Sequence, residues 1–289
     1  MMTNILKPFS SSILILLAGL SCTPHGKQYY EESGSVFHTP YLIKYESNRL
    51  LTDKIDAELQ AFNLSMNPFN PNSIISKVNR NEEVEVDDWF ITVFNKAMEV
   101  SGNSGGFFDV TAAPLINLWG FGFEKNDRIS QEKIDSIRSF VGYQKIHLND
   151  RRVIKDDPRI SLNFSAIAKG FASDVIAELF ECEGIENYMI EIGGEVMAKG
   201  KNPNGACWHI GINKPEDDVS GMKNEIYAIA RLCGKRGFAT SGNYRNFYIK
   251  DGKKYAHTIN PLTGYPSEQS LLSATIIAPD CMTADAYAT

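Results

Sequence analysis

Residues 163–195 read NFSAIAKGFASDVIAELFECEGIENYMIEIGGE, and this stretch decides the fold class. Small residues and a lysine at 166–170 open an apolar pattern with helical spacing, which predicts a helix over residues 168–182. The apolar run at 188–192 then predicts a strand, and the paired glycines after it predict a sharp turn. A helix that leads into a strand and a tight turn indicates helices packed on a sheet.

The rest of the chain extends this mixture of elements. Apolar spacing predicts further helices at 47–65, 88–101 and 130–141, a helix start at 280–289, and strands at 41–45, near Ile146, at 226–231 and at 273–277. Because strands and helices do not alternate regularly, we predict an α+β fold of mixed sheets and packed helices, one catalytic unit of two intimate lobes. We expect a polar tether at 22–34, a folded domain at 35–289 and, because the last helix is interrupted at Thr289, a natural segment beyond it.

Composition argues against one class of partner. The 289-residue chain is 43% hydrophobic, has a formal net charge of −6 and carries no cluster of Lys and Arg. These features argue against a nucleic-acid partner, because contacts to phosphate groups require a basic face. Cys182, Cys207, Cys233 and Cys281 lack the spacing of metal ligands, so we interpret them as buried small apolar side chains, with one or two disulfides as the alternative.

The N-terminus has the layout of a signal peptide. Lys7 precedes the apolar run at 13–20, and Cys22 follows closely after it. The run is shorter than the roughly 20 apolar residues of a spanning helix, so a transmembrane anchor is not expected. We expect that residues 1–21 are removed and that Cys22 is lipidated. The lipid would anchor the protein to a bacterial membrane, on the side that faces the periplasm. Gly19 stands where such sites usually carry Leu, and a plainly secreted protein is the alternative.

Five short segments carry residue types that bind or activate ligands. The first holds Asn163 and Lys169 at a helix start, where backbone N–H groups and an ammonium attract phosphate. The second and third are the turn at 193–195 and the hydroxyl-rich turn at 239–244. Taken alone, each of these three is equally compatible with an ordinary helix surface or turn.

The other two segments lie nearer the C-terminus. His257 precedes a turn built from Asn-Pro and Thr-Gly, and an imidazole with an unperturbed pKa of about 6.5 suits a general base. A lone histidine is nevertheless more often structural. Asp285 and Thr289 are four residues apart, hence on one helical face, and offer the hard oxygen ligands that Mg²⁺ prefers. The alternative for this pair is a solvated helix face.

Taken together and in this order, the segments resemble the FAD:protein FMN transferases, the ApbE-type flavin transferases once described as thiamine-biosynthesis lipoproteins. The resemblance also includes FHT at 37–39 with Tyr41, SIISKVN at 73–79, GFFDVT at 106–111, PL at 114–115 and LWGFG at 118–122. It therefore spans nearly everything from about residue 34 onward. Two departures are Asn163, where the family often has Asp, and Ser165-Ala166 in place of commoner glycine pairs.

The resemblance implies a set of site residues. A magnesium ion would be held by the Ala166 carbonyl, Asp285 and Thr289, and the catalytic residues would be His257, Lys169 and Asp285. FAD, the substrate, would contact Phe37, Phe69, Phe107, Phe108, Asp109, Asn163, Lys169 and Ile259. Among these, Phe69 lies in a turn-rich loop at the position that stacks on adenine.

The implied reaction is attack of a Thr or Ser hydroxyl of an acceptor protein, within a short flavinylation motif, on the FMN phosphate of FAD. This gives a phosphoester-linked flavin and releases AMP. His257 would accept the hydroxyl proton, while Mg²⁺ and Lys169 would stabilise the developing charge. The alternatives are a Mg²⁺-dependent FAD pyrophosphatase, which Phe69 disfavours, and a non-catalytic FAD-binding lipoprotein, which would not need the metal ligands or His257.

Overall fold

The computed structural model describes residues 26–122, 129–217, 225–244 and 246–289. The expected signal peptide and Cys22 lie outside these residues. At the centre of the described part is a six-stranded sheet in the order β1-β2-β5-β6-β9-β14, in which every neighbouring pair is antiparallel. The strands are β1 Gln28–Val36, β2 Thr39–Ser47, β5 Tyr188–Ile192, β6 Glu195–Lys199, β9 Arg236–Gly242 and β14 Ser273–Ala278. Together with the helices, this sheet confirms the α+β prediction.

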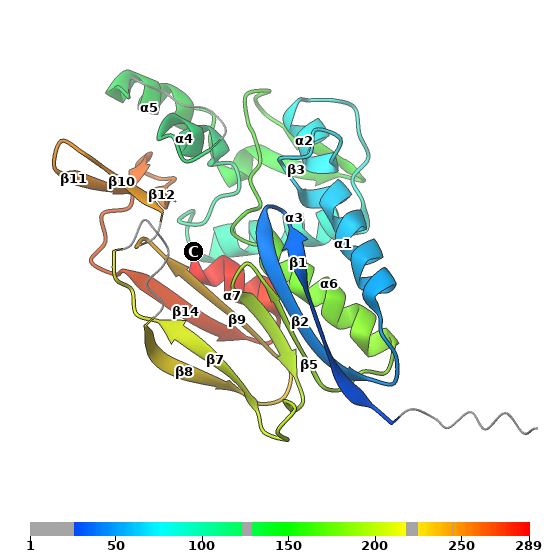
Figure 1. Cartoon of the computed structure of the whole chain (residues 1–289). Helices are drawn as coiled ribbons and strands as arrows, with labels where there is room; N and C mark the ends of the chain where they lie inside the picture. Colours follow the sequence, from blue (N-terminus) through cyan, green and yellow to red (C-terminus); the bar gives the residue numbers. More distant parts are fainter. Residues whose placement is uncertain (1–25, 123–128, 218–224, 245) are drawn as a thin grey trace, which may run out of the picture.

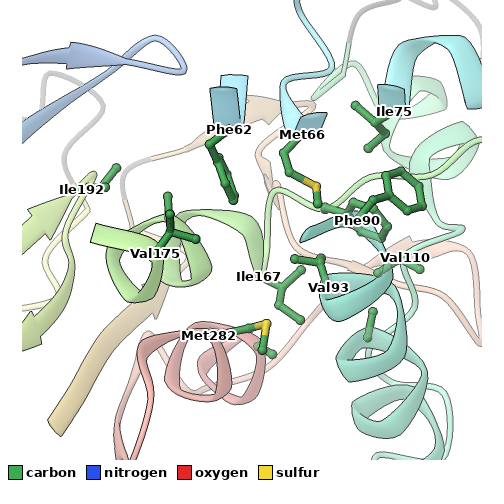
Figure 2. Close-up of a cluster of buried hydrophobic side chains, with 14 of the residues drawn as sticks. Phe62, Met66, Ile75, Phe90, Val93, Val110, Ile167, Val175, Ile192 and Met282 are labelled. Carbon is green, nitrogen blue, oxygen red and sulfur yellow. The ribbon is translucent and has the colours of Figure 1, made fainter. Parts of the chain in front are cut away.

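Two layers of helices cover one face of the sheet (Figure 1). Helices α6 (Ala168–Cys182) and α7 (Cys281–Ala288) lie on the strands, and α1 (Thr52–Met66) and α3 (Asp88–Asn103) pack on them from outside. Figure 2 shows the core between these elements, with Phe62 of α1, Phe90 of α3 and Met282 of α7 among its side chains. Each Å² of apolar surface that this core removes from water stabilises the fold by about 25 cal/mol. This removal is achieved with α6 and α7 packed between the sheet and the outer helices.

A disulfide-closed hairpin covers the opposite face. Strands β7 (Trp208–Asn213) and β8 (Ile226–Leu232) bring Trp208 and Leu232 into a small core with Val196 and Phe238 of the sheet. Trp208 and Leu232 are cross-strand partners, so the residues just outside them, Cys207 and Cys233, meet and form a disulfide. Cys182 is exposed and Cys281 is a buried free thiol. The interpretation of all four cysteines as buried free thiols is therefore wrong, and a disulfide is present.

The smaller elements lie in the upper part of Figure 1, above α6 and α7. Helix α4 (Ala113–Leu118) and the hairpin of β10 (Phe247–Lys250) and β11 (Lys253–Ala256) are joined by a row of rings, in which Trp119 stacks on Tyr255 and Tyr248 stacks on both Tyr255 and Phe121. The remaining elements are α2 (Ile74–Asn79), α5 (Gln131–Arg138), a 3₁₀ turn (Tyr143–Lys145), β3 (Ile146–Asn149), β4 (Arg152–Lys155), β12 (Ile259–Asn260) and β13 (Tyr265–Pro266). No helix in the described ranges is long and apolar enough to cross a bilayer.

Three expected boundaries are corrected by the structure. Most of the expected tether is strand: Gln28 to Gly34 belong to β1, which pairs with β2 from Gln28↔Ser47 to Val36↔Thr39. This edge strand is polar and largely exposed, so it lacks the apolar alternation that marks a half-buried strand. The helix expected at 47–65 begins only at Thr52, because β2 continues to Ser47, and the helix expected at 130–141 ends at Arg138.

Candidate active site

All five segments that the sequence analysis singled out as candidate ligand-binding segments meet at one cavity of about 450 Å³. The start of α6, the first residue of β6, the end of β9, the turn at 257–261 and the end of α7 form its walls together with the loop at 107–112. Expected site residues that line the cavity are Phe107, Phe108, Asp109, Asn163, Ala166, Lys169, His257, Ile259, Asp285 and Thr289. The turn at 239–244 contributes Thr240, Ser241 and Gly242, and the turn at 193–195 contributes Glu195.

Helices α6 and α7 cap each other. Asp285 of α7 accepts a hydrogen bond from the Gly170 amide in the first turn of α6, with 3.0 Å between N and Oδ2. In return, Asp174 of α6 accepts from the amides of Cys281 and Met282 at the start of α7, both at 2.8 Å. The first amides of a helix have no partner within it, so each carboxylate satisfies donors that would otherwise be unpaired. This exchange sets the position of the Asp285 carboxylate.

Gly170 makes the close approach of the two helices feasible. A Cβ atom at this position would lie 2.4 Å from the Cys281 carbonyl oxygen and 2.8 Å from Asp285 Cβ. Atoms do not approach that closely, so any side chain at 170 would separate α6 from α7. The glycine of the Ala-Lys-Gly segment is thus required by packing.

The Lys169 ammonium lies among three oxygen atoms. Its Nζ donates to the Ser165 carbonyl at 2.8 Å and is 3.3 Å from Glu195 Oε1 and 3.7 Å from Asp285 Oδ2. Burial by itself would lower the pKa of Lys169, but the charges of Asp285 and Glu195 outweigh it and raise the pKa. Lys169 is therefore a permanent cation at the cavity wall, suited to binding phosphate.

Glu195 is the counterpart of this cation. Only 7% of the residue is exposed, and burial raises the pKa of its carboxyl to about 8, against the opposing effect of Lys169. The turn before it leaves room for the lysine: Gly193 has a φ of +65°, and a Cβ there would lie 3.2 Å from Lys169 Cδ. Within the described residues, Glu195 Oε2 has no hydrogen-bond partner.

The expected metal ligands all line the cavity. Asp285 is 4% exposed, and Thr289, one helical turn later, donates from Oγ1 to the Asp285 carbonyl at 3.3 Å. Together with the Ala166 carbonyl they offer carboxylate, hydroxyl and carbonyl oxygens, a donor set that fits Mg²⁺, which usually keeps water and substrate phosphate as its other ligands. Groups of three or more His, Cys, Asp or Glu placed to hold a metal are not found in the described parts of the chain.

His257 is oriented by a backbone carbonyl. Its Nδ1 is 3.1 Å from the Asn246 oxygen, and since a carbonyl only accepts, Nδ1 carries the proton and Nε2 keeps a free lone pair. Burial lowers the pKa of His257, and the charge of Lys169 lowers it further, although the Asn246 carbonyl opposes this. The imidazole is therefore neutral near pH 7, as a general base must be.

Asp109 shapes the aromatic wall of the cavity. Its Oδ1 accepts from the amide and the hydroxyl of Thr111 at 2.8 and 2.6 Å, and its Oδ2 accepts from the Tyr143 amide at 2.8 Å. These bonds hold the loop that presents Phe107, largely exposed, and Phe108, buried, to the cavity. Asn163 likewise shapes its own turn by accepting from the Ser165 amide at 2.8 Å.

Two expected FAD contacts lie outside the cavity lining. The half-buried Phe37 ring packs in the core with its centroid 5.4 Å from that of Phe62. Phe69 is 57% exposed and contacts the His38 ring edge-on at 5.0 Å. Their assignment to FAD binding stays a prediction.

Two residues of the site were not identified from the sequence. Asp174 was missed altogether, although it lies one turn after Gly170 on the same face of α6, which is a usable signal. Glu195 was part of the Gly-Gly-Glu turn but had no role, because its pairing with Lys169 joins positions far apart in the chain.

Comparison with known proteins gives one consistent result. The sequence model described as the ApbE family matches residues 37–289. The chain is 36% identical to the FAD:protein FMN transferase of Vibrio cholerae, covering 96% of this chain and 84% of that protein. It is 35% identical to the protein of the same name from Haemophilus influenzae, covering 98% and 86%. The solved structure of the flavin transferase ApbE from Vibrio cholerae superposes with a TM-score of 0.80 at 34% identity, over 91% of this chain and 85% of that one.

Proposed function

This chain belongs to the ApbE family, and on that premise we propose that it transfers FMN from FAD to a Thr or Ser hydroxyl of a target protein, with Mg²⁺ as its metal ion. The observation that carries the proposal is the cavity that collects Lys169, His257 and the Asp285/Thr289 pair from three separate parts of the chain. A cation for phosphate, a neutral base and a set of hard oxygen ligands are the groups that phosphoryl transfer requires.

Each residue has a defined task in the proposed reaction. The acceptor hydroxyl oxygen forms a bond to the FMN phosphorus, the pyrophosphate P–O bond breaks, and AMP leaves with the electron pair. His257 Nε2 takes the hydroxyl proton, and the Lys169 ammonium stabilises charge on the phosphate oxygens. Ala166, Asp285 and Thr289 would hold Mg²⁺, which when bound supplies electrostatic stabilisation of the pyrophosphate and the leaving oxygen.

The proposal includes export and anchoring through a lipid on Cys22. Two features support it: the apolar run at 13–20 followed closely by a cysteine, and the Cys207–Cys233 disulfide. Structural disulfides persist mainly in oxidising compartments such as the periplasm. Mass spectrometry of the membrane-extracted protein would detect the lipidated N-terminal cysteine, and its loss in Cys22→Ser is the expected control.

The test of the activity uses the folded chain, FAD, Mg²⁺ and a candidate acceptor domain that carries a Thr/Ser motif. We expect a covalent adduct of FMN mass on the acceptor, absent with EDTA and absent for an acceptor whose hydroxyl residue is replaced by Ala or Val. Free FMN and AMP without adduct would establish FAD hydrolysis instead. If FAD is bound but stays intact in the presence of Mg²⁺, the chain is a non-catalytic flavin carrier.

A further inference from the structure

Glu195 places an unpaired oxygen atom in the wall of the cavity. The side chain is more than nine-tenths buried and its Oε1 faces the Lys169 ammonium at 3.3 Å, whereas its Oε2 makes no hydrogen bond within the described residues. A buried polar atom without a partner is unfavourable, so native proteins usually supply a partner from water or a ligand. Because Glu195 lines the cavity, a ligand bound there can be that partner.

The backbone around Glu195 fixes the direction in which its side chain leaves the strand. It is the first residue of β6, pairs with Ile192 of β5 and follows Gly193 and Gly194, whose φ angles are +65° and +97°. The Glu195 carbonyl also accepts from the buried Ser173 hydroxyl at 3.4 Å. The carboxyl group is therefore presented to the cavity by a tight turn whose shape requires glycine.

We propose that Glu195 Oε2 forms a hydrogen bond with a sugar hydroxyl of the bound nucleotide, which makes Glu195 a substrate-binding residue. The inference rests on the proposed function, since it takes a flavin nucleotide as the ligand. A hydroxyl suits this position because it donates to a carboxylate and accepts from a carboxyl group, whichever form Glu195 takes. Phosphate oxygens only accept, so they could pair with the protonated form of Glu195 alone and would be repelled by its ionised form.

The neighbours of Glu195 place this hydroxyl next to the phosphates. Lys169 is the cation that the cavity offers to phosphate, and Asp285 belongs to the expected metal set, so the pyrophosphate of FAD would lie against them. In FAD, hydroxyls of the ribityl chain flank the pyrophosphate on one side and those of the adenosine ribose on the other. Either is within reach of a group beside Lys169, and a binding experiment separates them.

The experiment measures affinities of unreactive ligands by calorimetry, so it does not depend on turnover. FMN carries the ribityl hydroxyls and ADP carries the ribose hydroxyls. We expect Glu195→Met, which keeps the volume of the side chain, to weaken binding of one of the two about tenfold, because the ligand hydroxyl would be buried without its hydrogen-bond partner. Glu195→Gln, which still pairs with a hydroxyl, is the matched control and should lose less than about threefold.

A double-mutant cycle with Lys169→Met separates direct contact from an effect through the lysine. We expect the loss caused by Glu195→Met to persist in the Lys169→Met background. A loss that vanishes there, or unchanged affinity for both ligands in Glu195→Met, would overturn the inference.

Should Glu195→Met not fold, Glu195→Ala takes its place with the same criteria. Wild-type protein that binds neither ligand would overturn inference and proposed function together, whereas nucleotide binding without transfer to an acceptor overturns only the transferase proposal.

Discussion

A single residue, Asp285, has two roles in the candidate site. It belongs to the proposed metal set, and it also accepts the Gly170 amide at the start of α6. Substitutions at this position therefore change both chemistry and stability, and the two effects have to be measured separately.

The substitution Asp285→Asn should separate the effect on chemistry from the effect on stability. Asp285→Asn keeps an oxygen for the Gly170 amide but loses the charge that binds Mg²⁺, so we expect nearly wild-type thermal stability with transfer reduced at least 100-fold. Asp285→Ala should lose the activity and also about 1 kcal/mol of unfolding free energy, as for loss of a helix cap. Thermal unfolding and a Mg²⁺ titration of the transfer rate check both, and undiminished activity in Asp285→Asn would rule out the metal assignment.

The environment of His257 predicts the pH dependence of transfer. Its pKa is lowered by burial, so the unprotonated base persists to a lower pH than for an ordinary histidine. We expect the transfer rate to fall on acidification with a midpoint below about 6.5, and this acid limb to be absent in a slow His257→Ala variant. Pre-steady-state rates measured across pH test this. Loss of FAD affinity in His257→Ala, with an unchanged profile of the chemical step, would make His257 a binding residue instead.

At the scale of elements, the site depends on the reciprocal capping of α6 and α7. Asp174 is half-buried against the first amides of α7, and desolvation of its carboxyl group raises its pKa to about 7, with the Cys281 and Met282 amides opposing that effect. Its protonation therefore couples folding to pH.

The sign of this coupling follows from the raised pKa. Between about pH 4 and 7 the Asp174 carboxyl group is protonated in the native state and ionised in the unfolded state. The contribution of Asp174 to the free energy of unfolding is therefore complete below about pH 4 and is lost as the pH rises through about 7. We expect the stability difference between wild type and Asp174→Asn to shrink across that window. Urea unfolding of both proteins at pH 5 and pH 8 measures it, and a difference that does not change with pH would contradict the assignment.

At the scale of the molecule, the sheet separates the site from the disulfide. Alternate residues of a strand face opposite sides, so Val196 packs under the β7–β8 hairpin while Met197 belongs to the core beneath the helices. The hairpin of β7 and β8 thus covers one face of the sheet, opposite the helices (Figure 1). The cavity forms at the helix-covered side, where the start of α6 and the end of α7 line it.

Removal of the disulfide should affect stability alone. The bond closes a loop with a sequence separation of 26, for which restriction of the unfolded chain predicts about 3 kcal/mol of stabilisation. We expect the double variant Cys207→Ser/Cys233→Ser to unfold at a correspondingly lower denaturant concentration while FAD affinity stays within about twofold of wild type. Denaturation curves and flavin fluorescence measure the two quantities. An equally large loss of FAD affinity would show that the hairpin supports the site.

Local patterns were sufficient for the elements nearest the site. Helix α6 and strand β5 have the bounds expected from apolar spacing and length, because α6 buries residues at helical spacing and β5 buries four of its five residues. The short motifs located the five candidate ligand-binding segments and, through their order, the family. The polar edge strand β1 had no such signal, because its position depends on pairing with β2 rather than on burial of its own side chains.

Only the tertiary structure brought these segments to one cavity and gave their side chains partners. The pairs Asp285 with Gly170, Asp174 with the start of α7, Glu195 with Lys169 and Cys207 with Cys233 join positions from about 25 to more than 100 residues apart. Such contacts leave no periodicity in the chain, since they depend on how sheet and helices pack and on the glycines that let them approach. The residue types of the chain determined which chemistry is available, and the packing of α6 and α7 on the sheet decided which groups perform it together.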